Sequence, residues 1–290
     1  MLDVFIHSLL DSLTVLLFVL AFHVLLSFFE GKVTRFLESK RKAAPALGAT
    51  FGLIPECGTS VVAADLFLKG HISLGTVVAV FLSCSDEALP ILFSDVSGRY
   101  WSGFLVIGCK LVIGTVVGLF VDLLYKKGKE EVREHLDACE GEKQEHFGCC
   151  HHQIEGQGDK WKEHLLHPLI HSLKIFVYVF IVTFLFATMV FYVGEDAIGA
   201  FLTKNFYLAP ILGTIVGLIP NCASSVLLST LFVSGSLSFA GLLSGLLMNA
   251  GLGMIMLFKK GASKKKAFLV LAICLASSIA FGYCFLALPF

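Results

Sequence analysis

The chain has 290 residues, of which 56% are hydrophobic and only 15% are charged, and its formal net charge is zero. Its mean hydropathy is +0.83, whereas soluble domains carry about 25% charged residues. These values exclude an ordinary soluble fold, and the balanced charge gives no sign of nucleic-acid binding. We predict an all-α polytopic protein of the cell membrane, embedded in the lipid bilayer. Eight apolar runs, each near the ~20 residues that cross a bilayer, carry this prediction: residues 4–29, 44–68, 72–93, 104–125, 169–193, 208–233, 237–258 and 267–288.

In the first half of the chain, two apolar runs are interrupted by polar or helix-breaking residues. Residues 44–68 contain Pro55-Glu56-Cys57, and residues 72–93 contain the run Ser83-Cys84-Ser85-Asp86-Glu87. Backbone groups freed by such breaks are tolerated at membrane depth only inside the protein or along a wet cavity. We predict that residues 44–68 form two short arms of about 10–12 residues, as in a re-entrant hairpin.

The second half of the chain repeats the first. Residues 44–93 align with residues 209–258 at a constant offset of 165, with about 18 identities in 50 ungapped positions. The densest stretch contains Gly-Leu-Ile-Pro-Glu-Cys at 52–57 and Gly-Leu-Ile-Pro-Asn-Cys at 217–222. We therefore divide the chain into a first transmembrane repeat (1–125), a hydrophilic linker (126–167) and a second transmembrane repeat (168–290).

Equivalent loops of the two repeats carry opposite charge. The loop after the first helix is basic only in the first half (residues 32–42), and the loop after the third segment is basic only in the second half (residues 259–266). Because basic loops stay cytoplasmic, this pattern predicts inverted-topology repeats with broken or re-entrant Pro/Cys helices, an arrangement typical of transporters. The alternative is eight plain helices in parallel halves, which would place the basic start of the linker outside.

Three acids at the breaks, Glu56, Asp86 and Glu87, are the strongest candidate ion ligands. An ionised carboxylate near the bilayer centre costs at least ~2.5–3.5 kcal/mol on insertion scales. Three of them are hard to explain unless a cation or protons compensate the charge. We expect these acids to bind a transported cation or to exchange protons for it. Acids that simply lie at a loop edge are the alternative.

The same breaks supply softer and neutral candidate ligands. Carboxylate and carbonyl oxygens suit hard cations such as manganese or sodium, whereas thiolates suit soft ions. The mixed set therefore predicts a site for a borderline divalent metal or a trivalent metalloid, although cysteines that merely pack are the alternative. The candidate thiols and amides are Cys57, Cys84, Cys222, Asn221 and Asn249.

Prolines and glycines recur at matching positions of the two repeats. We interpret Pro55, Pro220, Gly52 and Gly217 as structural hinges around the breaks. In the alternative interpretation the prolines only kink their helices, and the glycines only permit close helix packing.

The linker is the only long hydrophilic segment, and it is rich in His and Cys. A flexible tract of this composition can collect metal ions, although its spacing does not match a tetrahedral zinc site. With inverted halves the linker lies in the cytosol, where an exporter would need it. The candidate ligands of this weak site are His146, Cys149, Cys150, His151 and His152.

The chain carries the paired motifs at 52–57 and 217–222, and residues 83–87 follow the first of them. In these features it resembles a prokaryotic family of ten-transmembrane heavy-metal exporters. Members of this family are labelled manganese transporters or arsenic efflux proteins. The resemblance extends over nearly the whole chain. It implies ten membrane segments, which agrees with treating each Pro/Cys segment as two short arms.

These features predict a secondary transporter, a permease that exports a heavy-metal or metalloid ion such as manganese or an arsenic species, and not an enzyme. We expect no tightly bound cofactor, only the transported ion and, if transport is ion-coupled, a coupling proton or sodium. No nucleotide-binding motif occurs in the sequence, so we expect transport to be ion-coupled or passive unless a partner supplies ATP. A homo-oligomer is compatible with this interpretation. Two other functions stay open: a proton- or sodium-coupled transporter of a small anion or organic solute, and an intramembrane enzyme that uses Cys57 or an acid pair.

Overall fold

The structure is a computed structural model of the chain. It describes residues 43–54, 57–68, 70–84, 88–94, 101–125, 205–219, 222–259 and 264–287, together with single positions within 6–13 and 177–194. Within this part of the chain every regular element is a helix, and no strand occurs. The predicted all-α class is therefore confirmed for the described residues.

The described part of the first half, from residue 43 on, contains two pairs of short helices and one long helix. Its elements are α2 (Ala44–Gly52), α3 (Cys57–Leu68), α4 (Leu74–Ser83), α5 (Ala88–Phe93) and α6 (Trp101–Leu124). Pro45 lies in the first turn of α2, where a missing N–H costs no intrahelical bond. The predicted interruptions fall between α2 and α3 and between α4 and α5. The two arms of residues 44–68 have 9 and 12 residues.

The second half has the same order of elements. A 3-10 turn, η1 (Phe206–Leu208), is followed by α10 (Ala209–Gly217), α11 (Cys222–Val233), α12 (Phe239–Met248), α13 (Leu252–Lys259) and α14 (Lys264–Leu286). α10, α11 and α12 have 9, 12 and 10 residues, the same lengths as α2, α3 and α4. Each of the three begins 165 residues after its counterpart, so the sequence offset extends to the helices themselves.

The turns that follow α3 and α11 agree in their hydrogen bonds. Gly70 (φ 79°) and Gly235 (φ 82°) end these helices in the left-handed region, which favours glycine. Their N–H groups donate to the carbonyl three residues before, at 3.1 and 3.0 Å. Ser73 and Ser238 then cap α4 and α12, each accepting the N–H three residues further on. The two halves thus share local turn chemistry as well as helix lengths.

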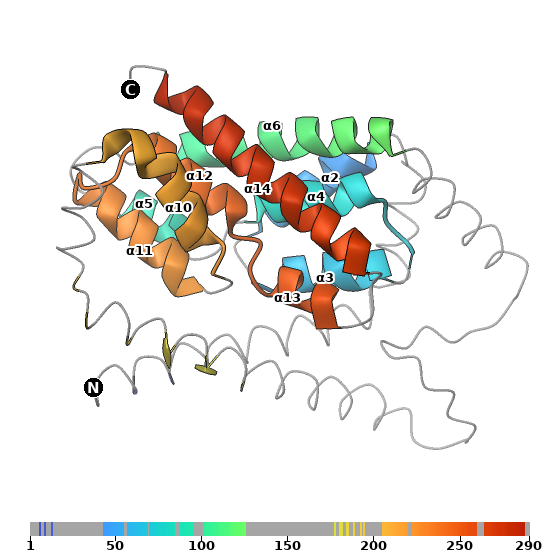
Figure 1. Cartoon of the computed structure of the whole chain (residues 1–290), viewed down its shortest axis with the longest axis horizontal. Helices are drawn as coiled ribbons and strands as arrows, with labels where there is room; N and C mark the ends of the chain where they lie inside the picture. The colour runs from blue at the N-terminus through green and yellow to red at the C-terminus, as the bar shows by residue number, and fades with distance from the viewer. Residues whose placement is uncertain are drawn as a thin grey trace, which may run out of the picture.

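The interrupted helices form the inner part of the molecule. α4 contacts α2, α6 and α12, and α12 contacts α10, α14 and α4. In the apolar spans that contain α4–α5 and α12–α13, 80% and 88% of the residues are buried, against 33% and 22% in α6 and α14. The inner helices α4 and α12 are therefore mostly buried, whereas α6 and α14 are more exposed, and in Figure 1 α14 runs across the near face of the molecule.

Each half also completes the packing of the other. α3 packs against α13, and α11 packs against α5, so each pair in Figure 1 joins helices far apart in sequence. In both pairs the second arm of one Pro/Cys segment lies on the short helix that follows the other half's break. The two halves are therefore interlocked, although whether they are inverted in the membrane stays a prediction.

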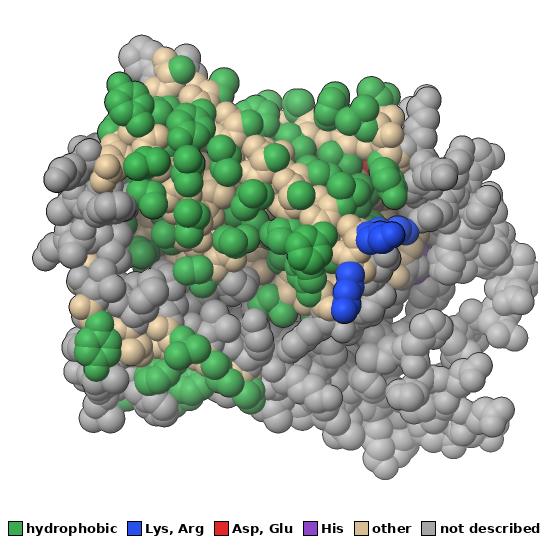
Figure 2. Space-filling view, viewed as in Figure 1, with side chains coloured by type: hydrophobic (Ala, Val, Ile, Leu, Met, Phe, Trp, Pro, Cys, Tyr) green, Lys and Arg blue, Asp and Glu red, His purple; other side chains and the backbone are tan. Residues whose placement is uncertain are grey.

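Four segments of the described chain are long and apolar enough to cross a membrane: Leu74–Phe93, Trp101–Leu124, Phe239–Phe258 and Lys264–Leu286. The outer faces of α6 and α14 expose large apolar side chains such as Phe104, Phe120 and Phe268. Figure 2 shows a largely hydrophobic face over these helices, with basic side chains at one edge. Lys264 and Lys265 at the start of α14 are exposed. The chain is a multi-pass membrane protein, and the linker (126–167) lies outside the described residues.

Candidate functional site

The break between α4 and α5 begins at Cys84. Cys84 is the C-terminal cap of α4, and its N–H donates to the carbonyl of Val80 at 2.8 Å. Its backbone is extended (φ −53°, ψ 124°), so the helix cannot continue. The side chain is 1% exposed, and its Sγ lies 3.9 Å from the hydroxyl oxygen of Thr59 in the first turn of α3. The two interrupted elements of the first half therefore meet at this thiol.

Asn249 occupies the matching position at the end of α12, 165 residues after Cys84. It is 2% exposed. Its side-chain oxygen accepts the N–H of Gly251 at 3.2 Å, the local bond by which asparagine stabilises a turn. Gly251 has φ 55°, in the region that favours glycine. Asn249 thus closes the break between α12 and α13, a structural role that the sequence analysis did not anticipate.

The breaks of the two halves come together where α3 and α13 begin. The N–H of Gly253 donates to the hydroxyl of Ser60 at 3.3 Å. A side chain at Gly253 would lie 2.6 Å from the carbonyl carbon of Ser60, so only glycine permits this approach. This contact joins the Pro/Cys element of the first half to the second break of the second half.

Buried hydroxyl groups follow both Pro/Cys motifs. Thr59 and Ser60 are fully buried in the first turn of α3, and Ser224 and Ser225 lie at the same positions of α11. The Ser224 hydroxyl donates to the carbonyl of Ile219 at 3.2 Å, across the interruption that precedes α11. Polar groups at this depth are expected where a break must be stabilised or a polar path is lined.

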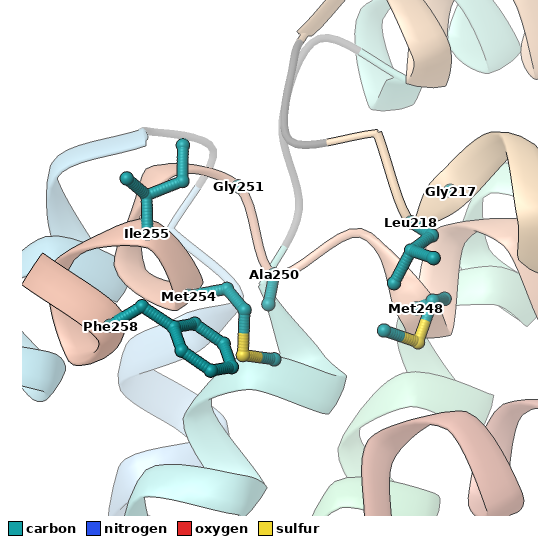
Figure 3. A pocket seen from close by; sticks show the side chains of 8 residues that line it. All are labelled: Gly217, Leu218, Met248, Ala250, Gly251, Met254, Ile255 and Phe258. Carbon is teal, nitrogen blue, oxygen red and sulfur yellow. The ribbon is translucent and has the colours of Figure 1, made fainter. Parts of the chain in front are cut away.

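A small cavity of about 70 Å³ lies between the end of α10 and the break after α12. It could hold more than one water molecule by volume, but its walls are mainly apolar. Figure 3 shows Ala250 between a Met248–Leu218 side and a Met254–Phe258 side. The cavity is lined by Gly217, Leu218, Met248, Ala250, Gly251, Met254, Ile255 and Phe258. It connects the predicted hinge residue Gly217 with the break at Ala250 and Gly251.

Gly52 and Gly217 end α2 and α10 at close helix contacts. A side chain at Gly52 would lie 2.6 Å from the Val80 carbonyl oxygen of α4, and one at Gly217 would collide with the carbonyl of Gly245 in α12. The structure thus assigns both glycines a packing role, as the alternative interpretation expected. Their role as hinges stays a prediction.

Several predicted site residues lie outside the described residues: Pro55, Glu56, Asp86, Glu87, Pro220, Asn221, and the linker residues His146, Cys149, Cys150, His151 and His152. Cys57 and Cys222 are the first residues of α3 and α11, but the positions of their side chains are not described. Among the described residues no group of three or more His, Cys, Asp or Glu side chains is placed to hold a metal ion.

Two buried charges in α6 were missed by the sequence analysis. Lys110 is 1% exposed and Asp122 is 2% exposed. The ammonium nitrogen of Lys110 donates to the carbonyl oxygen of Cys84, so it reaches the break between α4 and α5. Both residues lie inside an apolar run, and an ionisable residue within a membrane helix is itself a signal of function.

The apolar spans are interrupted at polar residues, and the interruptions of the two halves pack together. These features define a membrane protein with discontinuous helices. A family model described as "Putative, 10TM heavy-metal exporter" matches residues 1–173. Since this match covers more than half of the 290 residues, the chain belongs to that family. The match ends before the second copy of the motif, at residues 217–222. A search of curated proteins returned no match, and neither did a search of solved structures.

Proposed function

We propose that this protein is a secondary transporter that exports a heavy-metal or metalloid ion across the cytoplasmic membrane and has no enzymatic activity. The observation that carries the proposal is the meeting of interrupted apolar helices from both halves in the protein interior. The contact of Gly253 with Ser60 joins the halves, and Cys84 with Thr59 joins the two elements of the first half. Discontinuous helices that meet between repeats are where secondary transporters bind their substrates and coupling ions.

Glu56, Asp86 and Glu87 would bind the cation or exchange protons for it in this proposal. Cys57, Cys222 and Asn221 would complete the site, with the buried Cys84 and Asn249 at its edge. Manganese would use mainly the carboxylates, whereas an arsenic species would use mainly the thiols. Export is the proposed direction because the basic loops and the His/Cys linker would share the cytosolic side.

A second candidate function is the transport of a small anion coupled to protons or sodium. The buried ammonium of Lys110 supports it, because a fixed positive charge beside a helix break would attract an anion. The acids would then bind the coupling ion, and the N-termini of the short helices would face the substrate. Transport that is insensitive to thiol reagents and divalent metals would favour this candidate.

The test is ion uptake by inside-out vesicles that contain the full chain. Manganese, zinc, cobalt and arsenite would each be supplied outside, with and without an imposed proton gradient, to wild type and to the Glu56→Gln variant. We expect one ion to accumulate in wild-type vesicles and its uptake to fall at least tenfold in the variant. The control is Glu155→Gln, which removes a carboxylate from the linker and should transport as wild type does.

The opposite outcome is equally informative. If none of the four ions accumulates in vesicles whose protein is folded and correctly oriented, the metal proposal fails and the anion transporter becomes the first candidate. If an ion accumulates equally in wild type and in Glu56→Gln, transport stands but Glu56 is not on its path.

A further inference from the structure

Four residues of α6 at spacings of four face α4 along its whole length: Lys110, Gly114, Gly118 and Asp122. Residues four apart lie on one face of a helix. A side chain at Gly118 or Gly114 would lie 2.6 or 2.9 Å from a carbonyl oxygen of α4. The two glycines therefore let α6 lie directly against the backbone of α4, with a charged residue on either side of the contact.

The two charges lie at opposite ends of α4. At its C-terminal end, the Lys110 ammonium donates to the carbonyl of Cys84. At its N-terminal end, the Asp122 carboxylate accepts the N–H of Gly75 at 2.8 Å and the hydroxyl of Ser73 at 2.7 Å. A helix carries partial negative charge at its C-terminus and partial positive charge at its N-terminus. Each side chain thus lies at the end of α4 that attracts it.

The second half contains the same helix contact. A side chain at Gly118 of α6 would lie 3.0 Å from Cβ of Pro45, and one at Gly282 of α14 would lie 2.9 Å from Cβ of Pro210. Pro45 and Pro210 are equivalent in the repeat, so Gly118 and Gly282 are equivalent as well. This equivalence aligns α14 with α6 residue by residue.

The charges have no equivalents in the second half. Counting eight residues back from the aligned glycines pairs Lys110 with Cys274, and counting four residues on pairs Asp122 with Leu286. Cys274 is fully buried, and its carbonyl accepts the hydroxyl of Ser278 within α14. A thiol therefore stands where the first half has the ammonium, and among the described residues only the first half places a cation at the end of its inner helix.

Carbonyl groups at the ends of broken membrane helices coordinate sodium in secondary transporters, because they lack an intrahelical partner. At the end of α4 an ammonium group makes such a contact. We infer that the Lys110 ammonium takes the place of a bound alkali cation at the break between α4 and α5, and that this break needs no sodium. An ammonium carries the charge of one sodium ion and three hydrogen-bond donors, but it is tethered to α6.

The consequence for transport rests on the proposed function. A tethered cation cannot leave with the substrate or return down its gradient, so a sodium gradient cannot act at this break. Export would then be driven by protons or by the gradient of the transported ion itself. The inference about the break does not depend on transport, because cation binding can be measured on the purified protein.

The test is thermal unfolding of the purified full chain in sodium, potassium or choline chloride at constant ionic strength. Lys110→Met keeps an unbranched side chain of the length of the lysine alkyl stem and removes the ammonium. We expect this variant to melt below wild type in choline and to gain about 3 °C or more in sodium or potassium, saturating with concentration. The control, Lys264→Met, makes the same change at the exposed start of α14 and should show no salt-specific gain, like wild type.

Two results would overturn the inference: equal melting of Lys110→Met in all three salts, or stabilisation of wild type by sodium. Lys110→Arg keeps a positive charge and should stay insensitive to sodium. If Lys110→Met does not fold, the test is transport by wild-type vesicles in sodium and in choline. Equal transport in the two salts would support the inference, and an absolute requirement for sodium would contradict it. If no metal ion is taken up but sodium or potassium stabilises Lys110→Met relative to choline, only the proposed function is refuted.

Discussion

The pair α4 and α6 in the first half packs in the same way as the pair α12 and α14 in the second half. The two pairs differ in the charge of the side chains at the ends of the inner helix. Both pairs meet at an equivalent glycine, and both inner helices are capped by an equivalent serine. Within the part of the chain that the structure describes, only α4 has a buried cation at one end and a buried carboxylate at the other. The comparison teaches that backbone contacts fix the shape of each half, whereas charged side chains make the two breaks electrostatically different.

The largest expected effect tests the shared geometry. Gly217→Ala and Gly52→Ala should each destabilise the protein by about 3 kcal/mol, because the added methyl group would meet helix backbone that cannot rotate away. The measurement is the melting temperature of the purified chain. Gly108→Ala in α6, where nothing lies within 4 Å of the added group, is the control. A loss in only one of the two variants would show that the halves do not share this contact.

The next effect tests the charged end of α4. Asp122→Leu gives the first half the residue that the second half has at Leu286, and it removes the acceptor for two donors at the start of α4. We expect a loss of about 2 kcal/mol in thermal unfolding. Asp122→Asn keeps an acceptor oxygen and should lose less. Wild-type stability of Asp122→Leu would mean that the carboxylate adds nothing to the N-terminus of α4.

A smaller effect separates the two serine caps. Ser238→Ala should cost about 1 kcal/mol as an ordinary N-cap, and Ser73→Ala should cost more because its hydroxyl also donates to Asp122 at 2.7 Å. In the Asp122→Leu background the cost of Ser73→Ala should fall toward that of Ser238→Ala, with the 2.8 Å hydrogen bond between the Ser73 and Thr76 hydroxyls left as the remaining difference. A double-mutant cycle measures this difference, and strict additivity would argue against coupling between Ser73 and Asp122.

The smallest difference between the halves is expected at their turns. Gly70→Ala and Gly235→Ala each place a methyl group on a left-handed residue (φ 79° and 82°), which costs about 1 kcal/mol. Because the two turns share two backbone hydrogen bonds, from the glycine and from the residue after it, the two melting temperatures should agree. A clear difference between them would show that the surroundings, and not the backbone conformation, determine the cost.

The sequence predicted the breaks and the repeat because both leave local signals. The motif that includes Gly52 and Gly217 and the constant offset of 165 were enough to place the interruptions and to pair the helices. The packing of α3 on α13 could not be predicted, because contacts between segments almost 200 residues apart leave no periodic pattern in one sequence.

The candidate site was predicted less completely than the fold. Asn249 as a ligand stays a prediction, and its bond from the N–H of Gly251 to the amide oxygen is a structural role that residue type alone did not indicate. Lys110 was visible as a charge within an apolar run, yet its partner is a backbone carbonyl of α4, and no motif marks such a group. Residue type and spacing thus locate the breaks, whereas the partners of each side chain depend on the packing of other helices.

Because α3 packs on α13 and α11 packs on α5, the first half can complete its packing only after the second half has been synthesised. α3 ends at Leu68, and its partner α13 is complete only at Lys259. At elongation rates of ~5–20 residues per second, roughly 190 residues take about 10–40 s to be added. Throughout that interval the newly inserted first half lacks the partner for one of its buried surfaces. Membrane insertion factors or lipids must cover this surface on the nascent chain, and a ribosome that stalls before residue 259 would leave an insertion product prone to degradation.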